Sequence, residues 1–599
     1  MKNFLKMFLA SLLGVLAAMF LVWFISIVMM VGVVASLGSA KSAYVLKDNT
    51  VLQLDLEGSI SDRESNSFLV GLFSGMSEKS YGLEELLKAI NTAKENDKVL
   101  GIYIRTGDIS AGYAVLEPVR KALIDFKESG KFIVAYGDYY TQSAYFVTSV
   151  ADKVIMNPKG MMMLHGMSST IPFLKGTFDK LGIKYEVFKV GTYKSAVEPY
   201  IETKMSDANR EQVTSYVNSI WSHLLAGIAE SRHLTVDNLN RMADEYMDCS
   251  DPEKSVEYGL VDLLMFGQDV KETIKQLAGV DEKVEIKYAT VDNINAAPSS
   301  KKMKINKDKI AVLYAEGQIY SGEVKNIERM GENVITDKEY VKEIGKLKDD
   351  KNVKAVVFRI NSPGGSVFAS EQIWYAVTEL KKEKPVIVSM GDYAASGGYY
   401  IACAADMIVA EPTTLTGSIG GFTLIADAVD LHNKIGLTFD GVKTNKYSDL
   451  DVSTLIGKVK PFSNEERSIL QAYTNRFVDV FYTRCAEGRS KTKEEIAAIA
   501  QGRVWTGSQA LENGLVDKIG SLDDALKIAA EYAKLTEYDL KSYPEKKDPF
   551  TQLMEEMMGG GVKASLVRSF LGDDVYRQYL LVKGKTKPMD FMQAIISYE

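Results

Sequence analysis

The chain has 599 residues, of which 46% are hydrophobic and 25% are charged; this supplies cores for two to four domains and excludes general disorder. Its net charge is −8 at pH 7 and no block of five or more Lys or Arg occurs, so we exclude nucleic acid as a partner. The three cysteines and four histidines form neither a disulfide framework nor a metal-ligand pattern, and we expect no metal and no cofactor.

The first predicted element is a membrane-spanning helix. From Met7 to Leu37 the chain carries no charged residue, and about 20 apolar residues are enough for a helix to cross a bilayer. The alternative is a cleaved signal peptide, because residues 35–40 (ASLGSA) are mostly small. The apolar stretch is longer than the usual signal core of roughly 7–15 residues, so we expect residues 1–44 to form an N-terminal anchor. The flanking lysines give a slight bias toward an inside N-terminus.

The remaining chain contains an internal duplication, which has to be found before any motif is interpreted. With a constant shift of 254 positions and no gap, residues 99–194 align with residues 353–448. For example, VLGIYIR at 99–105 meets VKAVVFR at 353–359. The predicted organisation is a first repeat at 45–296, a polar linker at 297–309, a second repeat at 310–543 and a C-terminal tail at 544–599.

Within each repeat, short strands alternate with helices. Residues 355–360 and 385–390 are short apolar runs rich in β-branched side chains, whereas residues 340–347 carry apolar side chains three and four positions apart. These patterns are typical of strands and of an amphipathic helix, respectively. Their alternation indicates an α/β fold with largely parallel sheets and right-handed crossovers.

The two repeats differ at positions that could carry chemistry. Three aligned pairs stand out: Ser396 (in AASGG) against Gln142, SPGG at 362–365 against DISA at 108–111, and Lys194 against Ser448. Each repeat therefore keeps one part of a candidate site and has lost another. Glycines with a purely structural purpose would be expected in both copies, so the difference favours a functional interpretation.

A serine with a nearby lysine can act as a nucleophile. The hydroxyl of Ser396 needs a base, and an unprotonated lysine can serve as one. Burial away from carboxylates lowers the pKa of a lysine because the charged form loses its hydration. Glu198, one helical turn after Lys194, would oppose this lowering if its carboxylate pointed at the amine, and the sequence leaves its direction open.

The second requirement is an oxyanion hole built from backbone N–H groups. Ser396 precedes Gly397 at a predicted turn into a helix, so the N–H of Gly397 is one candidate donor. The other donor would come from Gly364 and Gly365, which follow the strand 355–360 at a turn set by Pro363.

Four motifs are specific when taken together: GTYKSAVEP at 191–199, RINSPGGSV at 359–367, GDYAASGGYYIACAAD at 391–406 and TGSIG at 416–420. Through them the chain resembles signal peptide peptidase A in its long, tandem-domain bacterial form, over nearly its whole length. The resemblance implies an α/β fold with two tandem Clp/crotonase-like domains, built of repeated ββα units and preceded by one transmembrane helix. It also implies a homotetramer, anchored in lipid of the bacterial cytoplasmic membrane by a single pass, with its catalytic region on the periplasmic side.

The same resemblance implies an activity and a role for each site residue. The activity is that of a serine endopeptidase with a Ser–Lys dyad, which degrades cleaved signal peptides and other apolar or unfolded peptides. Ser396 would be the nucleophile, and Lys194 the general base and then the general acid. Gly365 and Gly397 would be the oxyanion donors, and the hydroxyl of Ser418 would orient the lysine.

Two other functions are weighed against the protease. An acyl-CoA enzyme of the crotonase type would share the fold and a glycine-based oxyanion hole, and retention of CoA by the soluble region would favour it. A non-catalytic envelope scaffold would use the duplicated fold for assembly alone. Failure of a fluorophosphonate or peptide-aldehyde probe to label Ser396 in folded protein would favour that scaffold.

Overall fold

The computed structural model describes residues 14–16, 18–21, 44–63, 80–298, 306–322 and 333–545. Across these ranges no helix combines the length and apolar character needed to cross a membrane. Most of the apolar segment 7–37, predicted above to span a membrane, lies outside the described residues. So do residues 299–305 of the predicted linker and the predicted tail beyond residue 545.

The first half of the chain forms a parallel sheet with strand order β2-β1-β3-β4-β5-β7, and β8 pairs with β1. Its strands are β1 (Thr50–Ser61), β2 (Ser80–Gly82), β3 (Val99–Ser110), β4 (Phe132–Tyr140), β5 (Lys153–Met162), β7 (Leu263–Leu264) and β8 (Lys287–Ala289). Its helices are α3 (Leu83–Glu95), α4 (Tyr113–Lys127), α5 (Gln142–Thr148), α8 (Asp207–Arg232), α9 (Val236–Asp244), α10 (Pro252–Glu257), α11 (Val270–Ala278) and α12 (Val291–Ala296), with 3-10 turns η1 (Met247–Cys249) and η2 (Gly267–Asp269).

The second half builds a related sheet with order β19-β15-β13-β12-β9-β21, in which β14 bridges β13 and β20. All its pairings are parallel except β15 with β19. Its strands are β9 (Lys309–Glu316), β12 (Val353–Ser362), β13 (Val386–Ala395), β14 (Met407–Ala410), β15 (Leu415–Gly417), β19 (Val504–Thr506), β20 (Lys518–Ile519) and β21 (Asp539–Tyr543). Its helices are α13 (Asp337–Asp349), α14 (Val367–Lys381), α15 (Gly397–Ala402), α17 (Asn464–Arg489), α18 (Lys493–Ile499), α19 (Gly507–Glu512) and α20 (Leu522–Tyr532). A separate pair joins β10 (Gln318–Tyr320) to β11 (Val334–Thr336).

The side-chain patterns explain these elements. The central strands β3 and β12 each contain a mostly apolar run, 101–104 and 355–360, that is buried on both faces, as expected for parallel strands covered on both sides. Helix α3 buries Leu83, Leu86, Ala89, Ile90 and Ala93, whose spacing of three and four places them on one face.

The two halves repeat one another element by element. Helices α3 and α13 both have 13 residues, α4 and α14 both have 15, and α8 and α17 both have 26. Strand β4 starts at Phe132 and β13 at Val386, 254 positions later. The predicted duplication and the predicted α/β fold with largely parallel sheets are thus confirmed.

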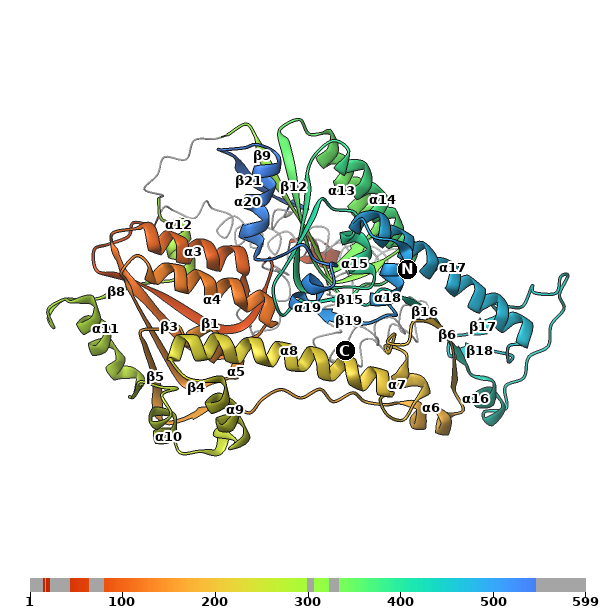
Figure 1. Ribbon diagram of the computed structural model, residues 1–599, viewed down its shortest axis with the longest axis horizontal. Coiled ribbons are helices and arrows are strands. Elements are labelled where there is room, and N and C mark those ends of the chain that lie inside the picture. Colours follow the sequence, from red (N-terminus) through yellow and green to blue (C-terminus); the bar gives the residue numbers. More distant parts are fainter. Residues whose placement is uncertain are drawn as a thin grey trace, which may run out of the picture.

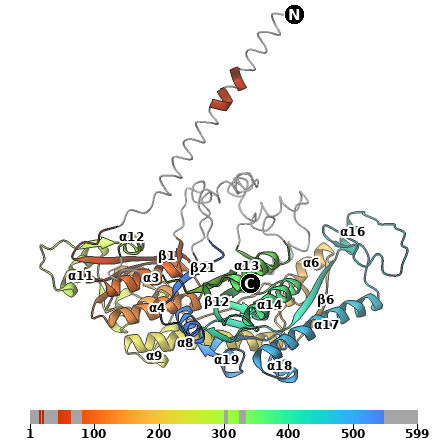
Figure 2. The same ribbon diagram turned by 90° about the horizontal axis from the view of Figure 1, so that it is seen from above.

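A third, four-stranded sheet is shared by the halves and has the order β17-β18-β16-β6. Strand β6 (Lys184–Val190) belongs to the first half, and β16 (Gly421–Asp427), β17 (Ser453–Thr454) and β18 (Gly457–Lys458) belong to the second. The short helices α6 (Lys175–Leu181), α7 (Glu198–Ile201) and α16 (Val429–Lys434) lie beside it. In Figure 1 this sheet lies at the right, and α8 runs back from α7 toward the first sheet. Figure 2 shows β6 at the same far end.

The shared sheet is where the repeats stop being alike. Residues 167–173 of the first half, which align with β16, form no strand, and neither do residues 438–444 of the second half, which align with β6. Strands β6 and β16 instead pair with each other, antiparallel, from Gly421 opposite Val190 to Asp427 opposite Lys184. Each half therefore contributes the strand that the other lacks.

Buried polar contacts also join the halves. Arg359 and Asp62 form an ion pair of 2.8 Å in which both side chains are buried. The carboxylate of Asp392 accepts hydrogen bonds from the N–H groups of Ala114 (3.1 Å) and Val115 (3.2 Å) at the start of α4. The pKa of Asp392 is raised to about 6, chiefly by desolvation. The strand that leads to Ser396 is thus anchored on a helix of the other half.

Candidate active site

Ser396 lies at a strained turn between β13 and α15. Its backbone has φ 53° and ψ −118°, a conformation that non-glycine residues rarely adopt and that is typical of functional sites. Its N–H donates to the carbonyl of Gly417 (2.9 Å), and its carbonyl accepts from Tyr400 (2.9 Å) to begin the helix. The predicted turn into a helix is confirmed, and the Ser396 side chain is partly exposed.

Lys194 reaches this serine from the first half. It lies four residues after the end of β6, and its side-chain nitrogen Nζ is 3.2 Å from Ser396 Oγ. The same nitrogen lies 2.8 Å from Ser418 Oγ and 2.9 Å from the Ser418 carbonyl oxygen. Pairing of β6 with β16 is what brings the lysine here, because β16 begins three residues after Ser418.

The amine of Lys194 is buried, and among the described residues it has no carboxylate partner. The residue is 4% exposed, and desolvation lowers the pKa of its amine to about 7. The carboxylate of Glu198 points elsewhere: it accepts from the Ser206 hydroxyl (2.6 Å), the Ser206 N–H (3.2 Å) and the Asn209 side-chain amide (2.9 Å). The sequence left open where the Glu198 carboxylate points. Because it points away from the amine, it does not oppose the lowering of the Lys194 pKa.

Two contacts between the halves hold the loop between β6 and α7 (residues 191–197), which carries Lys194 and is called the lysine loop below. The N–H of Tyr193 donates to the carbonyl of Gln501 at 2.9 Å. Gly502, with φ +75°, lies against the backbone of Lys194, where a Cβ would come within 2.7 Å of the lysine Cβ. Only glycine fits that approach without displacement. Gly502 could not be predicted as part of the site, because a glycine that precedes a short strand indicates no more than a turn.

Ser418 occupies a second strained turn, immediately after β15. Its φ is 49°, and its N–H donates to the carbonyl of Arg503 at 2.7 Å. The turn directs both its hydroxyl and its carbonyl oxygen at the amine of Lys194. The sequence did not indicate Arg503 as a partner, because it contributes a backbone carbonyl that any residue possesses.

The candidate oxyanion donors lie together. Gly364 has φ 110° and Gly365 has φ 149°, values that residues other than glycine rarely adopt. A Cβ on Gly364 would lie 2.7 Å from the nitrogen of Gly397, and a Cβ on Gly397 would lie 3.0 Å from the nitrogen of Gly365. Among the described residues, neither the Gly365 N–H nor the Gly397 N–H is shown donating a hydrogen bond to protein, so neither of these two candidate donors has a recorded partner.

The equivalent position in the first half is closed. Gln142, which aligns with Ser396, accepts hydrogen bonds at its side-chain oxygen from the N–H groups of His165 and Gly166, both at 3.0 Å. Ser448, which aligns with Lys194, is exposed and accepts a hydrogen bond from the N–H of Asn445 in its own turn. The structure thus contains one assembled set of these groups, made from both copies.

Comparison with known proteins identifies the family. The profile described as peptidase family S49 matches residues 125–281 and 378–536, once in each repeat, and the profile described as Clp protease matches residues 306–414. The chain belongs to peptidase family S49. It is a serine protease, and its two repeats are Clp-protease-like segments of mixed α/β structure. The resemblance stated from the motifs is confirmed.

Several curated relatives match this chain over most of its length. Protease 4 of Salmonella typhi is 35% identical over 530 residues, which cover 86% of this chain and 83% of that protein. Protease 4 of Haemophilus influenzae is 31% identical over 523 residues, 84% and 82% of the two chains. The chloroplastic serine protease SPPA of Arabidopsis thaliana is 30% identical over 520 residues, 86% and 74%. Among solved structures, a mutant ClpP1 of Listeria monocytogenes aligns with 36% of this chain and 94% of its own, with 17% identity and a TM-score of 0.24.

Proposed function

We propose that this S49 protease hydrolyses peptides with a Ser–Lys dyad formed by Ser396 and Lys194. The observation that supports this proposal is the 3.2 Å contact between Lys194 Nζ and Ser396 Oγ, made by an amine whose pKa burial lowers to about 7. Near neutral pH a large part of such an amine is unprotonated, which is the form that can accept a proton. No metal or cofactor takes part in the proposed chemistry.

Acylation begins with attack on the scissile carbonyl. A neutral amine has two N–H donors and one lone pair; the two oxygens of Ser418 receive the donors, and the lone pair accepts the proton of the Ser396 hydroxyl. As the serine oxygen bonds to the carbonyl carbon, the carbonyl oxygen becomes an oxyanion, which the N–H groups of Gly365 and Gly397 stabilise. Lys194 then gives the proton to the departing amine as the carbon–nitrogen bond breaks.

Deacylation repeats these roles with water. Lys194, neutral again, takes a proton from a water molecule that attacks the ester of Ser396. The second oxyanion occupies the same two N–H groups. Collapse breaks the ester bond, and the proton on Lys194 returns to the serine oxygen. The peptide acid leaves and the enzyme is restored.

For the substrate and the cellular setting we propose the remaining features that the family implies. The substrates are cleaved signal peptides and other apolar or unfolded peptides of the bacterial envelope. Residues 1–44 anchor the protein in the cytoplasmic membrane by one pass, with the catalytic region on the periplasmic side, and the protein assembles as a homotetramer. The two repeats act as domains bounded by residues 45–296 and 310–543. Membrane retention of the full chain under carbonate extraction, and its release when residues 1–44 are deleted, would test the anchor.

The dyad is tested with Lys194→Ala and a matched control. We expect K194A to abolish hydrolysis of an internally quenched peptide while its melting temperature shows an intact fold. The control is Lys184→Ala, which removes a lysine from the same β6 arm, where it forms an ion pair of 2.7 Å with Asp430 at the surface, and we expect normal turnover. Normal turnover by K194A would refute the dyad. CoA retained by the purified soluble region, together with no peptide cleavage, would instead support the acyl-CoA alternative.

A further inference from the structure

A buried glutamine contacts both sides of the lysine loop. Gln212 lies in the second turn of α8 and is 2% exposed. Its side-chain nitrogen Nε2 lies 3.0 Å from the carbonyl oxygen of Tyr193 and 2.8 Å from the hydroxyl of Ser195, the residues before and after Lys194. Its side-chain oxygen accepts from the N–H of Val504 at 3.2 Å.

These contacts join the lysine loop to the segment that holds Ser418. Val504 begins β19 and follows Arg503, whose carbonyl accepts the N–H of Ser418. A primary amide supplies N–H donors on one side and an acceptor on the other, so a single glutamine can link the loop of one half to a strand of the other. A carboxylate of the same size would have no hydrogen for the Tyr193 carbonyl, and a hydrocarbon could make none of these hydrogen bonds.

The glutamine belongs to a largely buried polar network at the start of α8. Gln212 Nε2 also lies 3.1 Å from the side-chain oxygen of Asn209, and Asn209 donates to the carboxylate of Glu198. Asn209 is 2% and Glu198 1% exposed. Ser206, the N-cap of α8, accepts from the N–H of Asn209 and donates its hydroxyl to Glu198. The network thereby also keeps the Glu198 carboxylate away from the amine.

The duplicated helix provides an internal comparison. Helices α8 and α17 both have 26 residues and align end to end. In that alignment Gln212 meets Ile469, which is 38% exposed, and Asn209 meets Glu466, which caps its own helix. A structural requirement of the helix would be expected in both copies. The amide instead occurs only in the half that carries the lysine, which is the signal by which the sequence could have revealed it.

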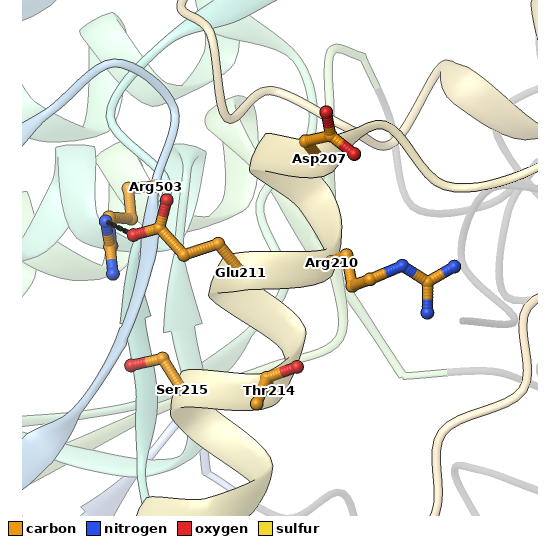
Figure 3. A pocket seen from close by; sticks show the side chains of 6 residues that line it. All are labelled: Asp207, Arg210, Glu211, Thr214, Ser215 and Arg503. Carbon is orange, nitrogen blue, oxygen red and sulfur yellow. Dashed lines mark hydrogen bonds and ion pairs between the residues drawn. The ribbon is translucent and has the colours of Figure 1, made fainter.

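Charged groups near the loop are paired with one another. Figure 3 shows the side chains of Glu211, on α8, and Arg503 joined to each other; both line the same pocket. Their ion pair measures 2.7 Å, and Glu211 also accepts from the Tyr193 hydroxyl at 3.0 Å. Neither these groups nor Glu198 forms a hydrogen bond or an ion pair with the Lys194 amine among the described residues. The pKa of the Lys194 amine therefore depends on how well the lysine loop excludes water.

We propose that Gln212 is a positioning residue for the reaction: its amide ties the Tyr193 carbonyl and the Ser195 hydroxyl, on either side of Lys194, to β19 and so holds the amine at Ser396 and Ser418, shut off from solvent. This inference rests on the proposed dyad. Displacement of a catalytic group by about 1 Å costs roughly a hundredfold in rate. Entry of water would also raise the pKa of the amine toward its ordinary value, because hydration favours the charged form.

The test is the pH dependence of peptide hydrolysis by Gln212→Met in the full chain. Methionine has a similar length and shape but no amide. We expect kcat to fall roughly tenfold or more with KM within about twofold, and the acid limb of kcat/KM to move upward by at least about half a pH unit. The matched control is Ser215→Ala. It removes a 2.9 Å hydrogen bond that the side-chain amide of Gln509, in the second half, donates to the Ser215 hydroxyl, and it leaves the lysine loop untouched. We expect the wild-type profile.

Three outcomes would count against the clamp. Wild-type kcat and an unshifted acid limb in folded Q212M would overturn it. So would a fall in kcat that only matches a smaller amount of active enzyme titrated by a fluorophosphonate. If Q212M does not fold, Ser195→Ala decides the question, because it removes the 2.8 Å contact alone: an upward shift of the limb supports the clamp, and an unchanged profile refutes it. K194A in the same series separates the two proposals, since an active K194A refutes the dyad itself.

Discussion

The lowered pKa of Lys194 predicts how activity depends on pH. With a pKa of about 7, half of the amine is neutral at pH 7, whereas an ordinary lysine would be neutral in only ~1 molecule in 3,000. Because the neutral form accepts the proton, kcat/KM should rise with pH through a midpoint near 7 and reach a plateau above about pH 8. The sign is fixed by burial, which penalises the charged form.

A carboxylate placed at Ser418 should move that midpoint in a predictable direction. Ser418 Oγ lies 2.8 Å from Lys194 Nζ, and at φ 49° an aspartate is tolerated. At about 4 Å and an effective dielectric constant of about 20, opposite charges attract by about 4 kcal/mol, or about three pKa units. Observed shifts for such pairs are roughly one to three units. In Ser418→Asp the midpoint should therefore lie between about 8 and 10, with a loss at pH 7 of about fivefold to about 500-fold that alkaline pH reverses.

The assay is hydrolysis of an internally quenched peptide from pH 5 to 10, with Ser418→Asn as control. Asparagine has the shape of aspartate and also lacks the hydroxyl, so the difference between the two variants isolates the charge. We expect S418N to keep a midpoint near that of the wild type, whatever its plateau. Equal midpoints for S418D and S418N, or a wild-type midpoint far from 7, would show that the protonation state of Lys194 does not control the rate.

Three further predictions concern the oxyanion donors, the contact between the halves and the stability cost of the lysine. Gly365→Ala should lower kcat by roughly 10²–10³, because φ is 149° and a Cβ would meet the carbonyl oxygen of Ile319 at 2.1 Å; unchanged kcat would exclude this N–H as a donor. Asp62→Ala should reduce the free energy of unfolding by about 3–5 kcal/mol, because it leaves the buried Arg359 charge uncompensated. Urea denaturation measures this loss, and a clearly smaller value would contradict the prediction. Lys194→Met should raise the free energy of unfolding at pH 7 by roughly 2–4 kcal/mol, at about 1.4 kcal/mol per pKa unit. Folding lowers the pKa of the Lys194 amine and therefore costs free energy, and methionine removes that cost. In the wild type this cost is greatest below pH 7 and fades as pH rises toward 10.5, so a Tm for K194M that is no higher than that of the wild type at pH 7 would contradict the buried amine.

Local patterns were sufficient for the repeated fold. The apolar runs at 355–360 and 385–390 predicted the strands β12 and β13, and the apolar spacing within 340–347 predicted α13. Comparison of the two copies singled out Ser396 and Lys194, whose side chains the structure brings within 3.2 Å of each other. Their catalytic roles stay predictions.

Contacts between distant segments were beyond local patterns. Nothing in residues 184–190 or 421–427 indicates that they pair with each other across the halves rather than within their own sheets. The direction of Glu198 depends on Ser206 and Asn209 at the start of α8, which no spacing rule connects to it. Gly502 matters because it has no side chain and so lets the Lys194 backbone come close. Every glycine lacks a side chain, so the sequence does not distinguish this one from the others.

The exchange of strands between the halves has a consequence for biosynthesis. When a ribosome has completed the first half, β6 has no partner strand among the described residues of that half, because the segment that pairs with it ends at Asp427 in the second half. On the proposed mechanism, the lysine emerges long before the serine it serves, and a prematurely terminated product is inert. On that mechanism the dyad forms only after the second half has been synthesised and has paired with the first, and the two copies together supply one such dyad among the described residues.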